Sequence, residues 1–214
     1  DDREYNSYSL KQDHRFSINE HLTLKAGLQF KQHEIDYDYK GIYERRYKYG
    51  DNDYWWEIDT NFTAKNISGH IFNAYLSNQL LISSLLAIEP GFRYDAVSYT
   101  DDKLYSPRLN IRITPMESTS INFCWGYFYQ PQKIYELDIP DGDTTFYLAE
   151  RAEHWIVGFD HDFKETVKLK IEGYVKKISN LKPDYRNWLN YINLFPEAWF
   201  DRIKLNIDRV TCRG

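Results

Sequence analysis

The breaks between the strand-like segments of this chain alternate between tight and long along its whole length. The tight breaks lie at residues 19–21, 82–85, 115–119 and 164–166, and the long or polar ones at 39–68, 100–104, 130–148 and 181–199. A soluble β-protein has no reason to sort its connections by length onto opposite ends of every strand. A barrel of the outer membrane does, because its periplasmic turns are tight and its extracellular loops are long. This alternation therefore predicts an all-β membrane barrel.

The segments between the breaks alternate apolar and polar residues with period 2. In segment 22–38, for example, Leu24, Ala26 and Leu28 share one face while Lys25, Gly27 and Gln29 share the other. A helix would place Leu24, Leu28 and Lys31 together, so the strand template fits better. The same alternation predicts about nine strands, which cover residues 4–18, 22–38, 69–82, 85–99, 105–114, 120–130, 153–163, 167–177 and 200–209. With hairpin signals throughout, these strands form a meandering antiparallel sheet.

The alternation also predicts which side chains face lipid. The convex, lipid-facing set is Phe92, Leu109, Ile111, Phe123, Trp125, Val157, Phe159, Leu169 and Ile171. The concave set, which lines a hydrated or plugged lumen, is Arg93, Arg108, Arg112, Asp160, Lys170 and Glu172. Mid-strand charges of this kind also suit the solvent face of a two-sheet sandwich, so the sorted breaks decide in favour of the barrel.

Composition excludes several classes of protein. Aromatic residues make up 17% of the 214 residues, which suits pleated sheets and interfacial girdles. The net charge of −5 mixes both signs and gives no basic footprint for nucleic acid. The mean hydropathy is −0.68, and no stretch approaches the roughly 18 apolar residues of a membrane helix. Cys124 and Cys212 form no CxxC pair, and we expect free buried thiols.

Signals for metal binding and catalysis are weak. Residues 138–143 are rich in carboxylates but lack the spacing of a calcium loop, so a surface turn is the simpler interpretation. His154 and His161 are seven residues apart and would lie on opposite faces of a strand. Glu150 and Glu153 with Asp160 and Asp162 suggest paired glycosidase carboxylates, but in strands they are more simply lumen and rim charges. We therefore expect no catalytic residue, no metal and no cofactor.

The long breaks carry exposed aromatic candidates. Tyr54, Trp55 and Trp56 lie in the break at 39–66, and Trp188 lies in the break at 181–199. Aromatic side chains on polar loops can stack on a ligand at low entropic cost. The alternative is that they pack the loops together or mark the outer membrane interface.

Four segments in order resemble one family. They are AIEPGFRYD (87–95), YSPRLNIRITPMESTSINFCWGYFYQPQKIYEL (105–137), AERAEHWIVGFDHDF (149–163) and LKIEGYVKKISNLKP (169–183). The second combines a Ser-Pro-Arg-Leu strand, a tight turn after Thr-Pro and an aromatic strand ending in Gln-Pro. This order resembles the barrels of TonB-dependent outer-membrane receptors, well over residues 67–214 and loosely over 1–66.

The resemblance implies a barrel of about 22 strands, closed by a plug domain, in the cell outer membrane. Such a receptor imports a scarce nutrient of the siderophore-iron, cobalamin or glycan class with energy delivered through TonB, and it is not an enzyme. Its partners would be outer-membrane lipid, its own plug, the TonB system and a small nutrient ligand. The chain departs from the family in having about nine strands, no plug and no closing aromatic strand. It is therefore interpreted as an internal barrel fragment over residues 1–214.

Two rival functions remain open from the sequence. One is a soluble β-sandwich or β-propeller piece that binds carbohydrate through the loop aromatics. The other is a passive porin, whose wide barrel shares the strand pattern. Extraction with or without detergent separates the first rival, and a plug encoded upstream separates the second.

Overall fold

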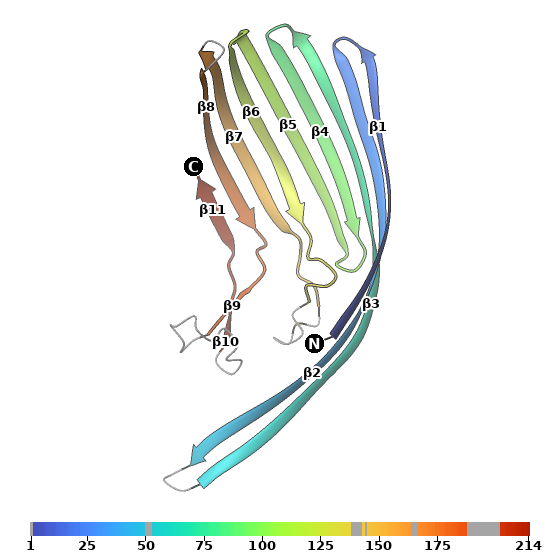
Figure 1. Ribbon diagram of the computed structural model, residues 1–214, viewed down its shortest axis with the longest axis vertical. Coiled ribbons are helices and arrows are strands. Elements are labelled where there is room, and N and C mark those ends of the chain that lie inside the picture. Colours follow the sequence, from blue (N-terminus) through green and yellow to red (C-terminus); the bar gives the residue numbers. More distant parts are fainter. Residues whose placement is uncertain (1, 50–52, 138–142, 144, 164–166, 188–201) are drawn as a thin grey trace.

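In a computed structural model, the chain forms one curved wall of nine antiparallel strands in the order β1-β2-β3-β4-β5-β6-β7-β8-β11 (Figure 1). The structure describes residues 2–49, 53–137, 143, 145–163, 167–187 and 202–214, and only the backbone of 2, 41–49, 53–63, 185–187 and 202–203. The wall strands are β1 (Asp2–Asn19), β2 (Leu22–Tyr49), β3 (Asp53–Ser83), β4 (Leu86–Val97), β5 (Asp102–Met116), β6 (Thr119–Gln130), β7 (Glu150–Phe163), β8 (Val167–Ser179) and β11 (Arg209–Arg213). A separate pair, β9 (Asp184–Asn187) and β10 (Arg202–Leu205), lies between β8 and β11 in sequence.

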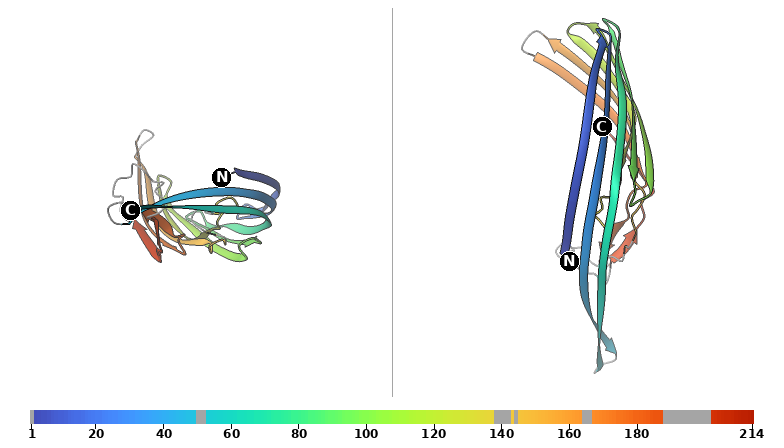
Figure 2. Two further views of the ribbon diagram at one scale, coloured as in Figure 1. Left: turned by 90° about the horizontal axis from the view of Figure 1, so that it is seen from below. Right: turned by 90° about the vertical axis from the view of Figure 1, so that its right-hand side faces the viewer.

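Sequence neighbours pair throughout the wall, as the hairpin pattern predicts. The tight turns gather at one end, which is uppermost in Figure 1, and the long connections gather at the other. Viewed from the long-connection end, the wall follows an arc (Figure 2). The described residues contain no helix that is long and apolar enough to cross a membrane. The predicted all-β class and the antiparallel meander are thus confirmed. The predicted sorting of the connections holds only in part, because β2–β3 and β4–β5 are joined through residues 50–52 and 98–101, and the long connections are those from β6 to β7 and from β8 to β11.

Three predicted boundaries are wrong. Most of the predicted break at 39–68 is strand, because β2 and β3 stay paired from Leu22↔Leu80 to Tyr49↔Asp53 without a shift. Tyr, Trp, Ile and Thr are frequent there, and these residue types favour strands. The break at 100–104 is shorter than predicted, since β5 already begins at Asp102.

The third error concerns the last predicted strand, at 200–209. The chain instead leaves strand structure between β10 and β11, at residues 206–208. Asn206 and Asp208 are depleted in strands by type, and they explain the interruption. The ninth strand of the wall is therefore β11, which pairs with β8 from Arg209↔Ser179 to Arg213↔Val175.

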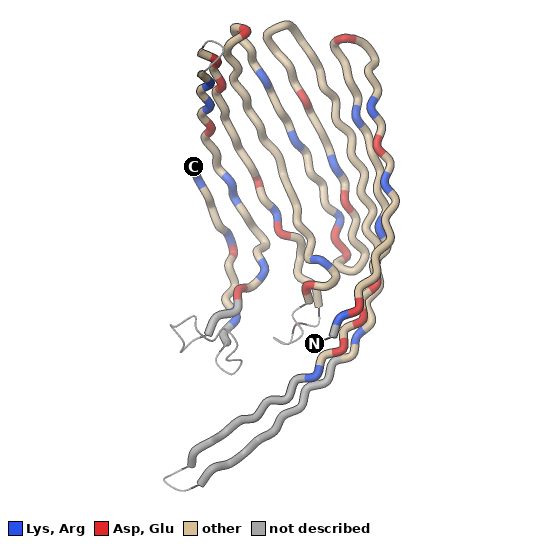
Figure 3. The backbone as a smooth tube through the Cα atoms, viewed as in Figure 1, with Lys and Arg blue, Asp and Glu red and all other residues tan. Residues whose placement is uncertain are grey.

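The register separates two chemically different faces. Directly paired residues share a face, so the pairs Ile111↔Phe123, Phe123↔Val157 and Phe159↔Ile171 carry one apolar face across β5, β6, β7 and β8. The other face carries Arg112↔Asn122, Gly158↔Glu172 and Asp160↔Lys170. Charged residues lie in mid-strand as well as at strand ends (Figure 3).

The polar face is the concave one. Ile35, Tyr37 and Tyr39 of β2 lie on it and are covered by the β6–β7 connection, which sits inside the arc of the wall. The opposite, convex face leaves large apolar side chains uncovered, such as Val157 at 55% and Ile171 at 57% exposure. The sidedness predicted for Phe92, Leu109 and Trp125, and for Arg93, Arg108 and Lys170, follows the same register.

Candidate functional site at the long-connection end

The connection between β6 and β7 turns inward and packs on the concave face of β2. Ile134 and Leu137 are 2% and 0% exposed and contact the side chains of Ile35, Tyr37 and Tyr39. An apolar cluster this well buried is not expected in a solvated loop, because burial of such side chains contributes roughly 1.5–3 kcal/mol each. The segment 131–137, called the inward segment below, is therefore fixed against the concave face at the long-connection end of the wall.

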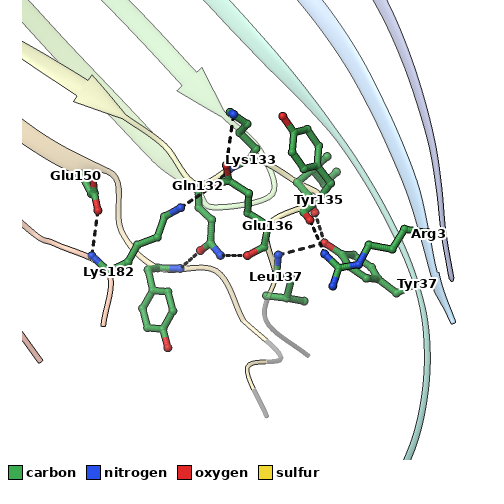
Figure 4. A network of polar contacts seen from close by, with 11 residues as sticks. Arg3, Tyr37, Gln132, Lys133, Tyr135, Glu136, Leu137, Glu150 and Lys182 are labelled. Atoms are coloured by element: carbon green, nitrogen blue, oxygen red, sulfur yellow. Dashed lines mark hydrogen bonds and ion pairs between the residues drawn. The ribbon is translucent and has the colours of Figure 1, made fainter. Parts of the chain in front are cut away.

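The hydroxyl of Tyr37 binds this segment through two hydrogen bonds. It donates a hydrogen bond to the carbonyl oxygen of Ile134 at 2.5 Å and accepts one from the backbone N–H of Leu137 at 3.2 Å (Figure 4). Arg3 of β1 donates through Nη1 to the carbonyl oxygen of Tyr135 at 2.8 Å. The ring of Tyr135 meets that of Tyr5 edge-on at 5.3 Å. Strands β1 and β2 thus bind a segment that follows β6, four strands further along the sheet.

Glu136 links the same segment to the connection after β8. Its carboxylate accepts a hydrogen bond from Lys182 Nζ at 2.7 Å and another from the backbone N–H of Lys133 at 3.2 Å. Burial alone would raise the pKa of the Glu136 carboxyl, but the hydrogen bond and charge of Lys182 and the donors of Lys133 outweigh burial and lower it below its ordinary value. Glu136 is therefore ionised at neutral pH, and its pair with Lys182 is formed.

The returning half of the connection is bonded to the first half and to β10. Gln132 accepts a hydrogen bond from the backbone N–H of Tyr147 at 2.9 Å and donates to the carbonyl oxygen of Glu136 at 2.7 Å. Asp143 accepts from the Tyr147 hydroxyl at 2.7 Å and from Lys204 Nζ at 3.1 Å. The carboxylate of Asp143 is therefore engaged within the loops.

Beside this inward segment, the concave face of the wall holds a pocket of about 410 Å³. Its lining includes Lys31, Asn73, Arg93, Asp95, Arg108 and Phe128. Asp95 accepts from Arg93 at 2.7 Å and also from Asn73, so this carboxylate is neutralised. Lys31 and Arg108 give the pocket a net positive lining that can contact a polar or anionic solute through charge-assisted hydrogen bonds.

The predicted aromatic candidates are not among the side chains that the structure describes at this site. Tyr54, Trp55 and Trp56 lie on β3 in the projecting part of the β2–β3 hairpin rather than in a loop, and their side chains are outside the described part of the structure. Trp188 lies outside the described residues altogether. Their contact with a ligand stays a prediction.

Sequence reasoning missed the inward segment itself. The sequence predicts the break at 130–148, but the residues weighed there as a possible site were the carboxylates of 138–143, and neither Ile134 nor Leu137 was assigned a role. The available signal was Ile134 and Leu137, two aliphatic residues three positions apart in an otherwise polar stretch that opens with Pro131. Aliphatic residues on that spacing have no role in a solvated loop and indicate burial against another element.

The weak catalytic and metal signals do not converge in space. Glu150 pairs with Gln130 on the concave face, whereas Glu153 pairs with Tyr127 on the convex face, so the two carboxylates point apart. Glu153 is thus a convex-face charge rather than a lumen charge. His154 and His161 lie on opposite faces, as predicted. Within the described residues no group of His, Cys, Asp or Glu is suited to hold a metal ion, and Cys124 and Cys212 are free and half-buried.

Comparison with known proteins identifies the architecture. No protein-family model matches the sequence, and no curated protein matches it. Among solved structures, the ferric enterobactin receptor PfeA from Pseudomonas aeruginosa matches 99% of this chain and 32% of its own, with a TM-score of 0.68 at 14% identity. The fold is that of an outer-membrane receptor barrel.

Two further structures match in the same way. The FrpB iron transporter from Neisseria meningitidis has a TM-score of 0.64 at 14% identity, over 99% of this chain and 32% of its own. The outer membrane transporter YddB from Escherichia coli has a TM-score of 0.61 at 11% identity, over 86% of this chain and 27% of its own. The chain thus spans about a third of the length of these barrel proteins.

Proposed function

We propose that this chain is barrel wall from a TonB-dependent receptor of the cell outer membrane, which takes up a scarce nutrient. The observation that carries the proposal is the match of 99% of the chain to the PfeA structure, with an apolar convex face and a charged concave face. In this role the convex face contacts lipid, and the concave face contacts the plug domain and the passing solute. The chain makes and breaks no covalent bond.

The dimensions of the apolar face support a membrane location. From Trp155 to Phe163 the outward residues of β7 are Trp, Val, Phe, His and Phe. Eight residue steps at about 3.4 Å rise span about 27 Å along the strand, or about 21 Å along the barrel axis at a tilt of about 40°. That height is close to the apolar band of about 25 Å that is typical of such barrels.

Within the nutrient classes, we propose a ferric siderophore ahead of cobalamin or a glycan. PfeA is a ferric enterobactin receptor and FrpB an iron transporter. The positive lining of the concave pocket, with Lys31 and Arg108, suits an anionic chelate better than a neutral sugar. The aromatic candidates Trp55 and Trp56 would add stacking contacts further out.

Uptake by the intact receptor in a strain that lacks its chromosomal copy tests this function. Labelled ferric siderophore, cyanocobalamin and maltooligosaccharide are offered separately, with and without a functional TonB gene. We expect uptake of the iron chelate that disappears without TonB. Uptake that persists without TonB identifies a passive porin, and a receptor fraction that extracts into buffer without detergent identifies a soluble carbohydrate-binding protein.

A double substitution tests the outer aromatics. With Trp55→Ala plus Trp56→Ala, and surface expression checked, ligand affinity should fall by about 1–3 kcal/mol per residue that is a true hot spot. Glu117→Ala, in a tight turn at the opposite end, is the matched control and should leave affinity unchanged. Wild-type affinity in the double variant would assign these tryptophans to loop packing.

A further inference from the structure

Successive cross-strand rows on the convex face of β6, β7, β8 and β11 change character toward the long-connection end. Two rows, Ile121–Phe159–Ile171 and Phe123–Val157–Gly173, carry no charge. The next three rows are Trp125–Trp155–Val175–Arg213, Tyr127–Glu153–Lys177–Thr211 and Tyr129–Arg151–Ser179–Arg209. Four cations therefore gather at the rim of the apolar face nearest the long connections, beside its tryptophans and beyond them.

These four residues, Arg151, Lys177, Arg209 and Arg213, form what we call the rim patch, and all of them are exposed. The guanidinium of Arg151 lies over the ring of Tyr127, 5.4 Å from its centroid. The acidic residue within these rows is Glu153. Its carboxylate accepts the indole N–H groups of Trp125 and Trp155 at 3.4 and 3.1 Å.

We propose that the rim patch binds the phosphate groups of an anionic lipid in the surrounding membrane leaflet. The inference rests on the proposed membrane location and adds a specific lipid site to it. Cations in the aqueous medium would need no apolar surface beside them, whereas this patch continues directly into a band of Trp, Val, Phe and Ile. Such a surface matches a molecule with phosphates at one end and acyl chains at the other, because the chains pack along the apolar rows while the phosphates reach the cations.

The position along the strands also suits a lipid rather than a free anion. Trp and Tyr side chains concentrate at the level where headgroups meet acyl chains. Toward the long connections, Lys177 lies one row beyond the tryptophans of the rim, and Arg151 and Arg209 lie two rows beyond them. The cations thus stand at headgroup height. Each cation near an anionic membrane surface strengthens binding by about fivefold.

The chain offers a closely matched control within one strand. Lys176 and Lys177 are adjacent on β8 at the same depth, but Lys177 lies opposite Glu153 on the convex face and Lys176 lies opposite His154 on the concave face. Lys170 is likewise on the concave face, opposite Asp160. Removing Lys176 and Lys170 therefore changes net charge as much as removing two rim cations, without touching the rim patch.

The experiment uses the intact receptor, purified in non-ionic detergent and stripped of lipid, with folding checked by heat-modifiable gel mobility. Native mass spectrometry measures its binding of diphosphoryl lipid A, monophosphoryl lipid A and phosphatidylethanolamine. Wild type should prefer the diphosphoryl form, and Arg151→Gln plus Lys177→Gln should weaken that binding by about 25-fold. Lys170→Gln plus Lys176→Gln should leave it unchanged. Inorganic phosphate at millimolar concentration should compete poorly, since it lacks the acyl chains.

Equal weakening in the rim and control variants, or equal binding of diphosphoryl lipid A and phosphatidylethanolamine by wild type, would overturn the rim site while leaving the barrel assignment intact. A protein that stays soluble and monomeric without detergent and binds none of these lipids would instead overturn the proposed membrane function. If the double rim variant fails to fold, the single substitutions Lys177→Gln and Lys176→Gln provide the same comparison. A Lys177→Gln protein that binds diphosphoryl lipid A as Lys176→Gln does would then reject the proposal.

Discussion

The hydroxyl of Tyr37 should control whether the inward segment stays docked on the wall. Tyr37→Phe keeps the ring but removes the group that bonds Ile134 and Leu137, leaving a buried carbonyl and a buried N–H without a partner. An unsatisfied buried polar group costs about 1–3 kcal/mol. The two together should weaken docking by about 2 kcal/mol or more, which is about a 30-fold change in the ratio of docked to undocked segment.

Hydrogen exchange of the intact receptor in detergent measures this change directly, because the amide of Leu137 is protected only while the segment is docked. Exchange at residues 132–137 should accelerate about 30-fold in Tyr37→Phe, with the tight turns unaffected. Tyr8→Phe is the matched control, since that hydroxyl belongs to a side chain 73% exposed on β1. Leu137→Ala should have a larger effect, about 2–5 kcal/mol, through loss of a fully buried side chain. Unchanged exchange at residue 137 in Tyr37→Phe would refute the role assigned to the hydroxyl.

Three further perturbations test other parts of the structure. Ile111→Arg places a charge on the convex face at a cost of roughly 2–4 kcal/mol in lipid. It should impair membrane assembly of the intact receptor, measured by heat-modifiable gel mobility, much more than Arg112→Ala does. Equal effects of the two substitutions would contradict the assigned sidedness. Gly27→Val should lower the unfolding temperature, because a Cβ at this position would overlap the ring of the tyrosine opposite, whereas Gly158→Ala meets only ordinary contacts. Acidification should free the inward segment, because the pKa of Glu136 is lowered in the folded protein. Its pair with Lys182 therefore stabilises docking at pH values above the ordinary carboxyl pKa of about 4.5 and is lost as the pH falls through the lowered pKa. A nitroxide at residue 135 in a cysteine-free background would report this loss as rising mobility.

The strands of the wall and their two faces could be predicted from the sequence, because the residues that determine them are neighbours in the chain. Strict period-2 alternation assigns each side chain to a face, so Ile111 and Arg112 could be placed on opposite sides without knowing any contact. Alternation on both strands is consistent with the pairs Ile113↔Ile121 and Ile111↔Phe123, although the register of β5 with β6 shifts between Ile113 and Met116, next to the turn at 117–118. Errors appeared where strand propensity continued past the expected membrane boundary, as in the β2–β3 hairpin.

The inward segment could not be predicted in the same way, because its anchors are distant in sequence. Tyr37 and Leu137 are 100 positions apart, and nothing in the local pattern of β2 distinguishes Tyr37 from its neighbour Tyr39. Which loop folds inward depends on which apolar residues of the wall remain uncovered after all strands have paired. That is a property of the assembled arc rather than of any segment.

The arrangement divides stability and specificity between the two ends of the wall. Backbone ladders and alternating faces build the strands, and they tolerate many side chains as long as each face keeps its polarity. At the long-connection end, by contrast, single groups such as the Tyr37 hydroxyl and the Glu136 carboxylate join elements that no ladder connects. A substitution there should change how the loops at the long-connection end pack, while the barrel still forms. In the proposed receptor, variants of Glu136 or Lys182 should therefore alter uptake before they alter membrane insertion.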